Sequence, residues 1–234
     1  TNRGTTAARV EATYTAATGM FPGAGGSGTV VDSLAPGEQR VVPDAIGWLR
    51  ATKGLPIPPG PGQAGTLRLV FTGLSQPGLA SARARTTAAS CGGAAGLSYP
   101  AWPAGASAGS ALKLFGLRSS SAERTNLAVV NVGTEGSVRL KVVLRAGDGS
   151  RTYEVPSALL PALAPGEWRQ VNDVDLLRAA GFSDATALVT AVEGTAPFNA
   201  YAVFNDNLSN DGSFVPALPA EAAGGDLVVP VVVE

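Results

Sequence analysis

Apolar residues in this chain gather in short stretches of roughly ten residues, separated by turn-forming Gly, Pro, Ser and Asn. Segments such as Arg9–Tyr14 and Val138–Val143 have the composition of β-strands. Helical periodicity is confined to two short segments, Ile46–Lys53 and Val174–Ala180. The pattern predicts an all-β protein made of antiparallel β-sandwiches, with one short helix inserted in each.

A seven-residue motif occurs twice. Leu34–Arg40 recurs as Leu163–Arg169, 129 residues later, with six of the seven positions identical. Two further pairs match at this spacing, Asn2–Thr5 with Asn131–Thr134 and Arg9–Tyr14 with Val138–Val143. The matches continue in order at shorter spacings: Thr66–Thr87 with Thr186–Asn207, Pro77 with Pro197, and Tyr99–Pro103 with Val215–Pro219. We therefore expect two tandem domains, 1–103 (the N-terminal half) and 104–219 (the C-terminal half), followed by a linker and strand, 220–234.

Several matched positions have a backbone explanation. In Ala-Pro-Gly-Glu the proline sets the second position of a turn and the glycine supplies the positive φ at the third, which predicts a type II turn between strands. Asp44 and either Asn172 or Asp173 are expected to cap the short helices, and Gly54 and Gly181 to end them. The run 54–62, rich in Pro and Gly, predicts a polyproline-like surface loop that the C-terminal half lacks.

The two halves differ at their beginnings. The C-terminal half opens with an apolar strand, Leu112–Leu117, and a polar connector, 119–124. Thr1 falls at the position of Val130, so the N-terminal half has no counterpart of residues 112–129. The chain thus begins in the middle of an expected strand, which suggests a window on a longer protein.

A matching apolar segment is found near the other end of the chain. It follows Pro219 at nearly the spacing at which Leu112 follows Pro103, and its aliphatic residues are Leu227, Val228, Val229, Val231, Val232 and Val233. The linker 220–226 reaches at most about 25 Å, too short to return along two domains. We therefore predict that residues 227–233 complete the N-terminal half of the next unit, by strand donation or by covalent continuation of a longer repeat protein.

The motifs Asn-x-Gly-Thr and Leu-Ala-Pro-Gly-Glu-x-Arg resemble those of Ig-like repeats in large secreted surface proteins of bacteria. The resemblance covers nearly the whole chain and implies turn and strand architecture, with no catalytic residue. The C-terminal strand is similar in principle to strand-complemented pili, in which a neighbour's strand fills an incomplete sandwich. This resemblance and the surface rich in Thr, Ser and Gly imply a secreted protein, located outside the cell or on its surface.

Composition removes several classes of function. The net charge of −1, with 15% charged residues, provides no basic field for nucleic acid. No apolar run approaches the roughly 18 residues that cross a bilayer, so we expect no membrane insertion. The chain has no histidine, the commonest general base and metal ligand, and we predict no enzyme activity, catalytic residue, cofactor or metal. The single cysteine, Cys91, is expected to be an inert thiol rather than an intermolecular crosslink.

Two sets of residues leave alternatives open. The oxygens of 205–207 and 210–213 suit calcium, but their spacing favours an Asx-rich turn. Trp48, Trp102 and Trp168 could stack on sugars, although isolated tryptophans more often lie in cores and domain junctions.

The leading hypothesis is a non-enzymatic extracellular structural subunit that assembles with itself head to tail into a filament or surface array. The alternative is an adhesin-like or carbohydrate-binding module of a larger secreted protein, with a surface glycan as its partner.

Overall fold

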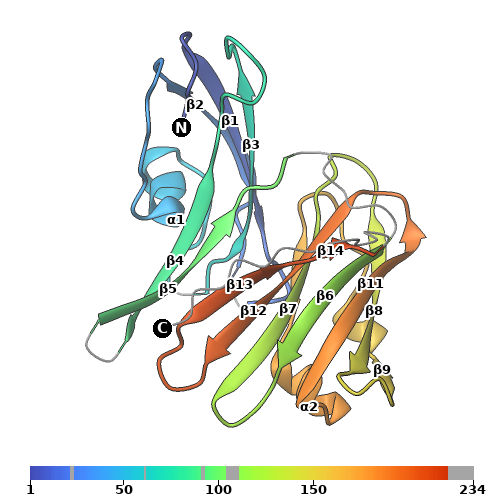
Figure 1. Ribbon diagram of the computed structural model, residues 1–234. Helices are drawn as coiled ribbons and strands as arrows, with labels where there is room; N and C mark the ends of the chain where they lie inside the picture. The colour runs from blue at the N-terminus through green and yellow to red at the C-terminus, as the bar shows by residue number, and fades with distance from the viewer. Residues whose placement is uncertain (22–23, 61, 91–92, 104–110, 221–234) are drawn as a thin grey trace.

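The computed structural model describes residues 1–21, 24–60, 62–90, 93–103 and 111–220 (Figure 1). Strands dominate these residues, every strand pair is antiparallel, and the helices are short. The predicted all-β sandwich class is confirmed.

The C-terminal half forms two facing sheets. One has the order β14-β6-β11-β8-β9 and the other the order β10-β7-β12-β13. The strands are β6 (Ala111–Arg118), β7 (Glu123–Asn131), β8 (Val138–Ala146), β9 (Thr152–Glu154), β10 (Trp168–Val171), β11 (Asp184–Gly194), β12 (Phe198–Asp206), β13 (Gly212–Pro216) and β14 (Leu218–Pro219). Side chains from both sheets form one core, in which Leu112, Leu114 and Leu117 of β6 are fully buried.

The N-terminal half is built differently. Its main sheet has only three strands, in the order β2-β1-β3, and a separate two-stranded hairpin is formed by β4 and β5. These strands are β1 (Ala8–Ala16), β2 (Gly28–Leu34), β3 (Gly65–Thr72), β4 (Arg83–Ser90) and β5 (Gly93–Pro100). A small core lies on one face of the three-stranded sheet and is composed of Ala12, Tyr14, Ala16, Val30, Leu49, Leu55 and Ile57.

Matching contacts occur around the Ala-Pro-Gly-Glu turns. Asn2 and Asn131 are both fully buried, and each side-chain oxygen accepts from the backbone N–H two residues later, at 2.9 and 2.8 Å. Each amide nitrogen donates to the carbonyl of the leucine that precedes the turn, Leu34 or Leu163. Gly37 and Gly166 have φ of 70° and 75°, as the predicted turn requires.

The register of the strands corrects two of the sequence matches. The buried faces of β1 and β8 coincide when Ala8, not Arg9, is placed on Val138. The loop 132–137 is one residue longer than its counterpart 3–7, and this shifts the strand. Similarly, Arg3 N donates to Leu79 O, whereas Val132 N donates to Pro197 O, so Leu79 rather than Pro77 matches Pro197.

The match of β3 with β11 agrees with the strand pairing. Leu69 lies opposite Ala12 of β1, and Val189, 120 residues after Leu69, lies opposite Val142 of β8. The hairpins match as well, because Pro100 lies opposite Arg83 and Pro216 lies opposite Tyr201, the residues at which the pairing of each hairpin begins.

The short helices begin and end largely as expected. Asp44 accepts from Gly47 N at the start of α1 (Ala45–Gly47), which continues as a π-helical turn, Trp48–Thr52, before Gly54 at φ 76°. Gly181, at φ 68°, ends α2 (Leu177–Ala180). The cap expected from Asn172 or Asp173 is absent at this helix, because neither side chain bonds to its N-terminus.

Asp173 has another role: its Oδ2 atom accepts from Ser119 and pairs with Arg178, both at 2.7 Å. The Pro-rich loop also departs from the prediction of a surface loop. Leu55 and Ile57, which are 8% and 3% exposed, enter the core of the N-terminal half.

Candidate functional site: the open edge of β3

Among the described residues, the outer edges of both β2 and β3 are unpaired, and the edge of β3 is the one whose counterpart in the C-terminal half is covered by another strand. β1 is paired on both sides, with β2 and β3, whereas β3 pairs only with β1. In the C-terminal half the matching strand, β11, is paired on both sides, with β8 and with β6. The open edge of β3 is therefore the edge that β6 occupies on β11.

The backbone groups that face this open edge follow from two hydrogen bonds. Ala17 N donates to Ala64 O on the β3 side of β1, whereas Ala16 N donates to Ser27 Oγ on the β2 side. In an antiparallel pair the N–H and C=O groups of successive residues point to opposite neighbours. Gly65, Leu67, Leu69 and Phe71 consequently direct both backbone groups away from β1, toward the open edge.

The side chains at this edge are apolar and incompletely covered. Leu67 and Leu69 lie opposite Tyr14 and Ala12, whose side chains are buried, so all four face the same core. Leu67 is nevertheless 44% exposed, and Leu69 and Phe71 are only half-buried. The residue that matches Leu67 is Ala187, which is 1% exposed beneath the leucines of β6.

A further strand edge, along β4, is also unpaired among the described residues, but its exposed side chains include two arginines. β12 lies between β13 and β7, whereas β4 pairs only with β5 among the described residues. Residues 39–42, which match β10, form no strand. Arg83, Arg85, Thr86 and Thr87 of β4 are exposed, and charged side chains protect a strand edge from further pairing. The apolar edge of β3 is therefore the stronger candidate for an assembly contact.

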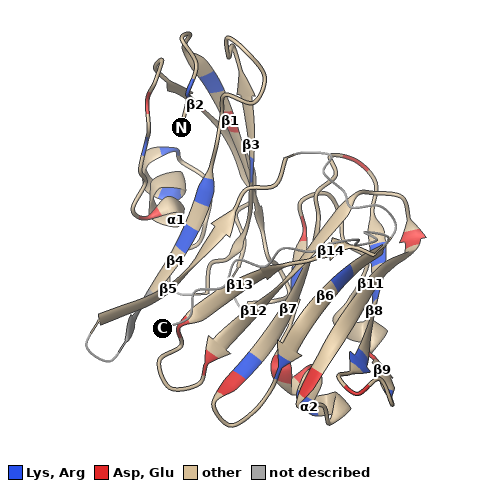
Figure 2. Cartoon of the chain, viewed as in Figure 1, with Lys and Arg blue, Asp and Glu red and all other residues tan. Residues whose placement is uncertain are grey.

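Four charged side chains form ion pairs beside the Ala-Pro-Gly-Glu turn at residues 35–38. Arg40 pairs with Asp32 and Glu38, each at 2.7 Å, and Lys53 pairs with Asp32 at 3.1 Å. The pKa of Asp32 is lowered although its partial burial opposes the change, because Ser33 N–H, Arg40 and Lys53 donate to the carboxylate. Elsewhere the positions of Lys, Arg, Asp and Glu are scattered along the ribbon, with the two signs interspersed (Figure 2).

The junction between the halves contains an aromatic cluster. Tyr99 and Trp102 pack against Tyr201 and Phe214, with ring centroids 5.8–6.2 Å apart. Trp168 Nε1 donates to Tyr201 Oη at 2.8 Å, and burial strongly raises the pKa of Tyr201. The hairpin β4–β5 thus packs, through β5, on the sheet of the C-terminal half (Figure 1).

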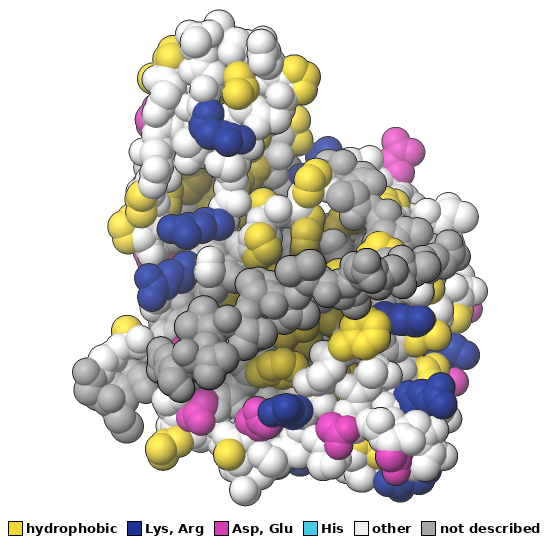
Figure 3. All heavy atoms as spheres, viewed as in Figure 1, with side chains coloured by type: hydrophobic (Ala, Val, Ile, Leu, Met, Phe, Trp, Pro, Cys, Tyr) yellow, Lys and Arg dark blue, Asp and Glu magenta, His cyan; other side chains and the backbone are white. Residues whose placement is uncertain are grey.

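All three tryptophans pack against other residues of the protein, in cores or at the junction, which is the alternative that the sequence favoured over sugar stacking. Trp102 and Trp168 belong to the junction, and Phe21 stacks on Trp168 with ring planes 11° apart. Trp48 packs against the small core of the N-terminal half beneath Lys53. Figure 3 shows further apolar side chains on the visible face along the boundary between the halves.

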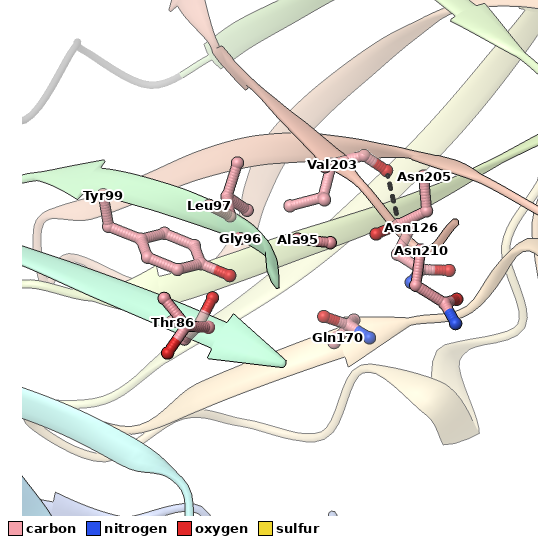
Figure 4. A pocket seen from close by; sticks show the side chains of 12 residues that line it. Thr86, Ala95, Gly96, Leu97, Tyr99, Asn126, Gln170, Val203, Asn205 and Asn210 are labelled. Atoms are coloured by element: carbon pink, nitrogen blue, oxygen red, sulfur yellow. Dashed lines mark hydrogen bonds between the residues drawn. The ribbon is translucent and has the colours of Figure 1, made fainter. Parts of the chain in front are cut away.

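A shallow cleft of about 200 Å³ lies between the hairpin and the C-terminal half (Figure 4). Four amide side chains line it, from Asn126, Gln170, Asn205 and Asn210. Tyr99 and Thr86 border the opposite side, on the hairpin. Sequence reasoning missed this cleft, because its amides come from separate segments and share no spacing.

Residues 205–213, whose side-chain oxygens are the candidate calcium ligands, form a hydrogen-bonded turn. Asp206 Oδ1 accepts from Leu208 N and from Ser209 N and Oγ, at 2.6–3.0 Å. The guanidinium of Arg124 donates to Asn207 and Asn210. These contacts confirm the Asx-rich turn, in which the oxygens accept N–H and O–H groups.

The remaining predicted residues fall outside the described part of the chain. These are the assembly residues Leu227, Val228, Val229, Val231, Val232 and Val233, together with Cys91. In the ranges that the structure describes, no helix is long and apolar enough to span a bilayer, and no group of three or more His, Cys, Asp and Glu side chains is placed to hold a metal. Comparison with protein-family models, curated proteins and solved structures finds no match to this chain.

Proposed function

We propose that this chain is a non-enzymatic structural subunit, built from two copies of an Ig-like unit, that assembles with itself head to tail. Residues 227–233 of one subunit complete the open edge of β3 in the next. The observation that carries the proposal is the contrast between Leu67, 44% exposed at this edge, and Ala187, 1% exposed at the matching edge that β6 covers.

The energetics favour an added strand at this position. Burying one aliphatic or aromatic side chain contributes about 1.5–3 kcal/mol, and Leu67, Leu69 and Phe71 all remain to be covered. The edge also presents backbone donors and acceptors that an extended segment satisfies by β-augmentation. The segment 227–233 is aliphatic at six of its seven positions, as a strand buried in such a core requires.

The geometry of this contact leads to a polymer. The donor segment lies in the last part of the sequence and the acceptor edge lies in the first half, so the two contact surfaces differ. A heterologous contact that does not close into a ring propagates as a filament. We place this filament or array outside the cell, on the basis of the resemblance to bacterial surface repeats.

The test removes the donor strand. A chain without residues 226–234 is expected to be monomeric in light scattering and to form no filaments in negative stain. A synthetic peptide of residues 226–234 should bind this truncated chain, and the same peptide with Val229→Asp should not. Assemblies of unchanged length after truncation would refute the proposal.

A second candidate function, glycan binding, is favoured by the amide-lined cleft. Amides beside an aromatic ring suit the hydroxyl groups and apolar faces of a neutral oligosaccharide. A panel of neutral oligosaccharides tested by calorimetry addresses it: Gln170→Ala should abolish binding, whereas Gln39→Ala, at an exposed amide outside the cleft, should not. Absence of any binding by the full chain rules this function out.

A further inference from the structure

We propose that the donated strand pairs with β3 in one antiparallel register, with Leu227 opposite Leu69, Val229 opposite Leu67 and Val231 opposite Gly65. This inference rests on the proposed head-to-tail assembly and specifies its joint. It follows from three features: the pairing of β6 with β11, the position of Pro230, and the glycine bulge that β6 has and residues 227–233 lack.

The pairing of β6 with β11 gives the starting register. Leu112 lies opposite Val189, and Leu114 lies opposite Ala187. The residues of β3 that match Val189 and Ala187 are Leu69 and Leu67, 120 residues earlier. Placing Leu227 on Leu112 then brings Leu227 opposite Leu69 and Val229 opposite Leu67.

The single proline of the segment supports this placement. In the proposed register Pro230 lies opposite Thr66, whose backbone groups point toward β1 rather than toward the open edge. The nitrogen of Pro230 therefore faces away from β3, where no donor is needed. A shift by one residue would place Pro230 opposite Leu67, where its missing N–H would forfeit a ladder hydrogen bond. The same shift would turn Leu227 and Val229 out of the core.

The bulge in β6 explains why the donated strand continues differently. The pairing of β6 shifts between Ala185 and Ala187, and Gly116 there has φ of 66°. Residues 227–233 contain no glycine, and valine at positive φ is strongly disfavoured. The donated strand is therefore regular, and Val231 rather than Val232 reaches Gly65. Since Gly65 has no side chain, Val231 meets none from β3 at that position.

Disulfide trapping tests the register directly. In the proposed register Val228 and Arg68 form a non-hydrogen-bonded pair, in which Cα atoms approach to about 4.5 Å. Arg68 is exposed, and its side chain has no hydrogen bond or ion pair among the described residues, so its replacement removes no polar contact there. All variants contain Cys91→Ser, which leaves the introduced cysteines as the only thiols.

One chain carries Arg68→Cys, and a second carries Val228→Cys. Mixed and oxidised, they should form a covalent dimer on a non-reducing gel. The matched controls replace Val228→Cys with Asp226→Cys or Pro230→Cys. These thiols lie about 7 Å farther along the strand in the proposed register and should give about tenfold less dimer.

The outcomes separate the register from the assembly. A dimer formed preferentially with Asp226→Cys or Pro230→Cys overturns the register and supports the head-to-tail joint. No dimer with any of the three donors, for variants whose circular dichroism matches the parent chain, overturns the joint itself. A chain that carries Arg68→Cys and Val228→Cys together should give a ladder of covalent multimers, and an internally crosslinked monomer would refute donation between subunits.

Discussion

Tyr14 and Leu67 lie directly opposite one another in adjacent strands and face the same core, yet Tyr14 is 2% exposed and Leu67 is 44% exposed. The difference arises because, in the part of the chain that the structure describes, β1 has a neighbouring strand on each side and β3 has one on only one side. The apolar side chain of Leu67 is therefore left in contact with solvent at the unpaired edge.

A charge at this edge should prevent assembly. Leu67→Glu places a carboxylate where the donated strand must bury apolar side chains, which is costly without a partner. We expect filaments to disappear in negative stain, while circular dichroism shows retained strand content. The control is Val31→Glu, at a residue 49% exposed in β2, away from the open edge. Filaments that persist with Leu67→Glu would place the joint elsewhere.

Fusing copies of β6 and β7 in front of Thr1 should also stop assembly. Thr1 matches Val130, so residues 111–129 fused before Thr1 provide the N-terminal half with its own copies of β6 and most of β7. This variant is expected to be monomeric and to unfold at a higher temperature than the parent chain, because Leu67 becomes covered. A graft with Leu112, Leu114 and Leu117 changed to Ser should show neither effect. Equal melting temperatures for the two grafts would contradict the prediction.

Asn131→Ala should destabilise the C-terminal half. The buried side chain of Asn131 accepts from Gly133 N and donates to Leu163 O and Gly136 O. Truncation leaves the buried Gly133 N–H without its acceptor and removes one of the two hydrogen bonds that Leu163 O accepts, at a cost of about 2–4 kcal/mol in the free energy of unfolding. Urea denaturation followed by tryptophan fluorescence measures the loss. Asn172→Ala, at an exposed asparagine, serves as the control and should cost far less.

The Asp206 turn predicts a specific dependence of stability on pH. Hydrogen bonds from Ser209 N–H and Oγ–H lower the pKa of Asp206 in the folded chain, so the folded value lies below the unfolded one. The ionised carboxylate of Asp206 therefore stabilises the folded chain fully above the ordinary pKa of aspartate. This stabilisation is lost as the pH falls through the lower pKa that Asp206 has in the folded chain. Asp206→Asn should lower the unfolding free energy at pH 7 and have a smaller effect at pH 3. Equal effects at both pH values would contradict this assignment.

Local signals predicted much of the fold. The positive φ of Gly37 and Gly166, the helix stops at Gly54 and Gly181, and the cap by Asp44 all depend on a few neighbouring residues. The strand register was wrong at Arg9, because a one-residue difference in loop length moves every side chain to the other face without changing the composition.

Features that depend on distant contacts were not predicted. Leu55 and Ile57 lie in a segment with the composition of a surface loop, and only their spacing of two residues hints that both face one side. The amide cleft and the packing of the hairpin on the opposite half combine residues from both halves of the chain. The open edge of β3 could be anticipated because no segment of residues 1–103 matches β6, but its exposed leucine could not.

The hairpin β4–β5 belongs in sequence to the N-terminal half, yet its aromatic residues pack on the C-terminal half. The two halves are therefore joined by the chain and by this packed hairpin at once. In the proposed filament, tension that pulls the hairpin off the C-terminal half has to break the contacts of Tyr99 and Trp102 with Tyr201 and Phe214. The force that separates them, measured by pulling single molecules, should therefore fall when Trp102 is replaced by Ala.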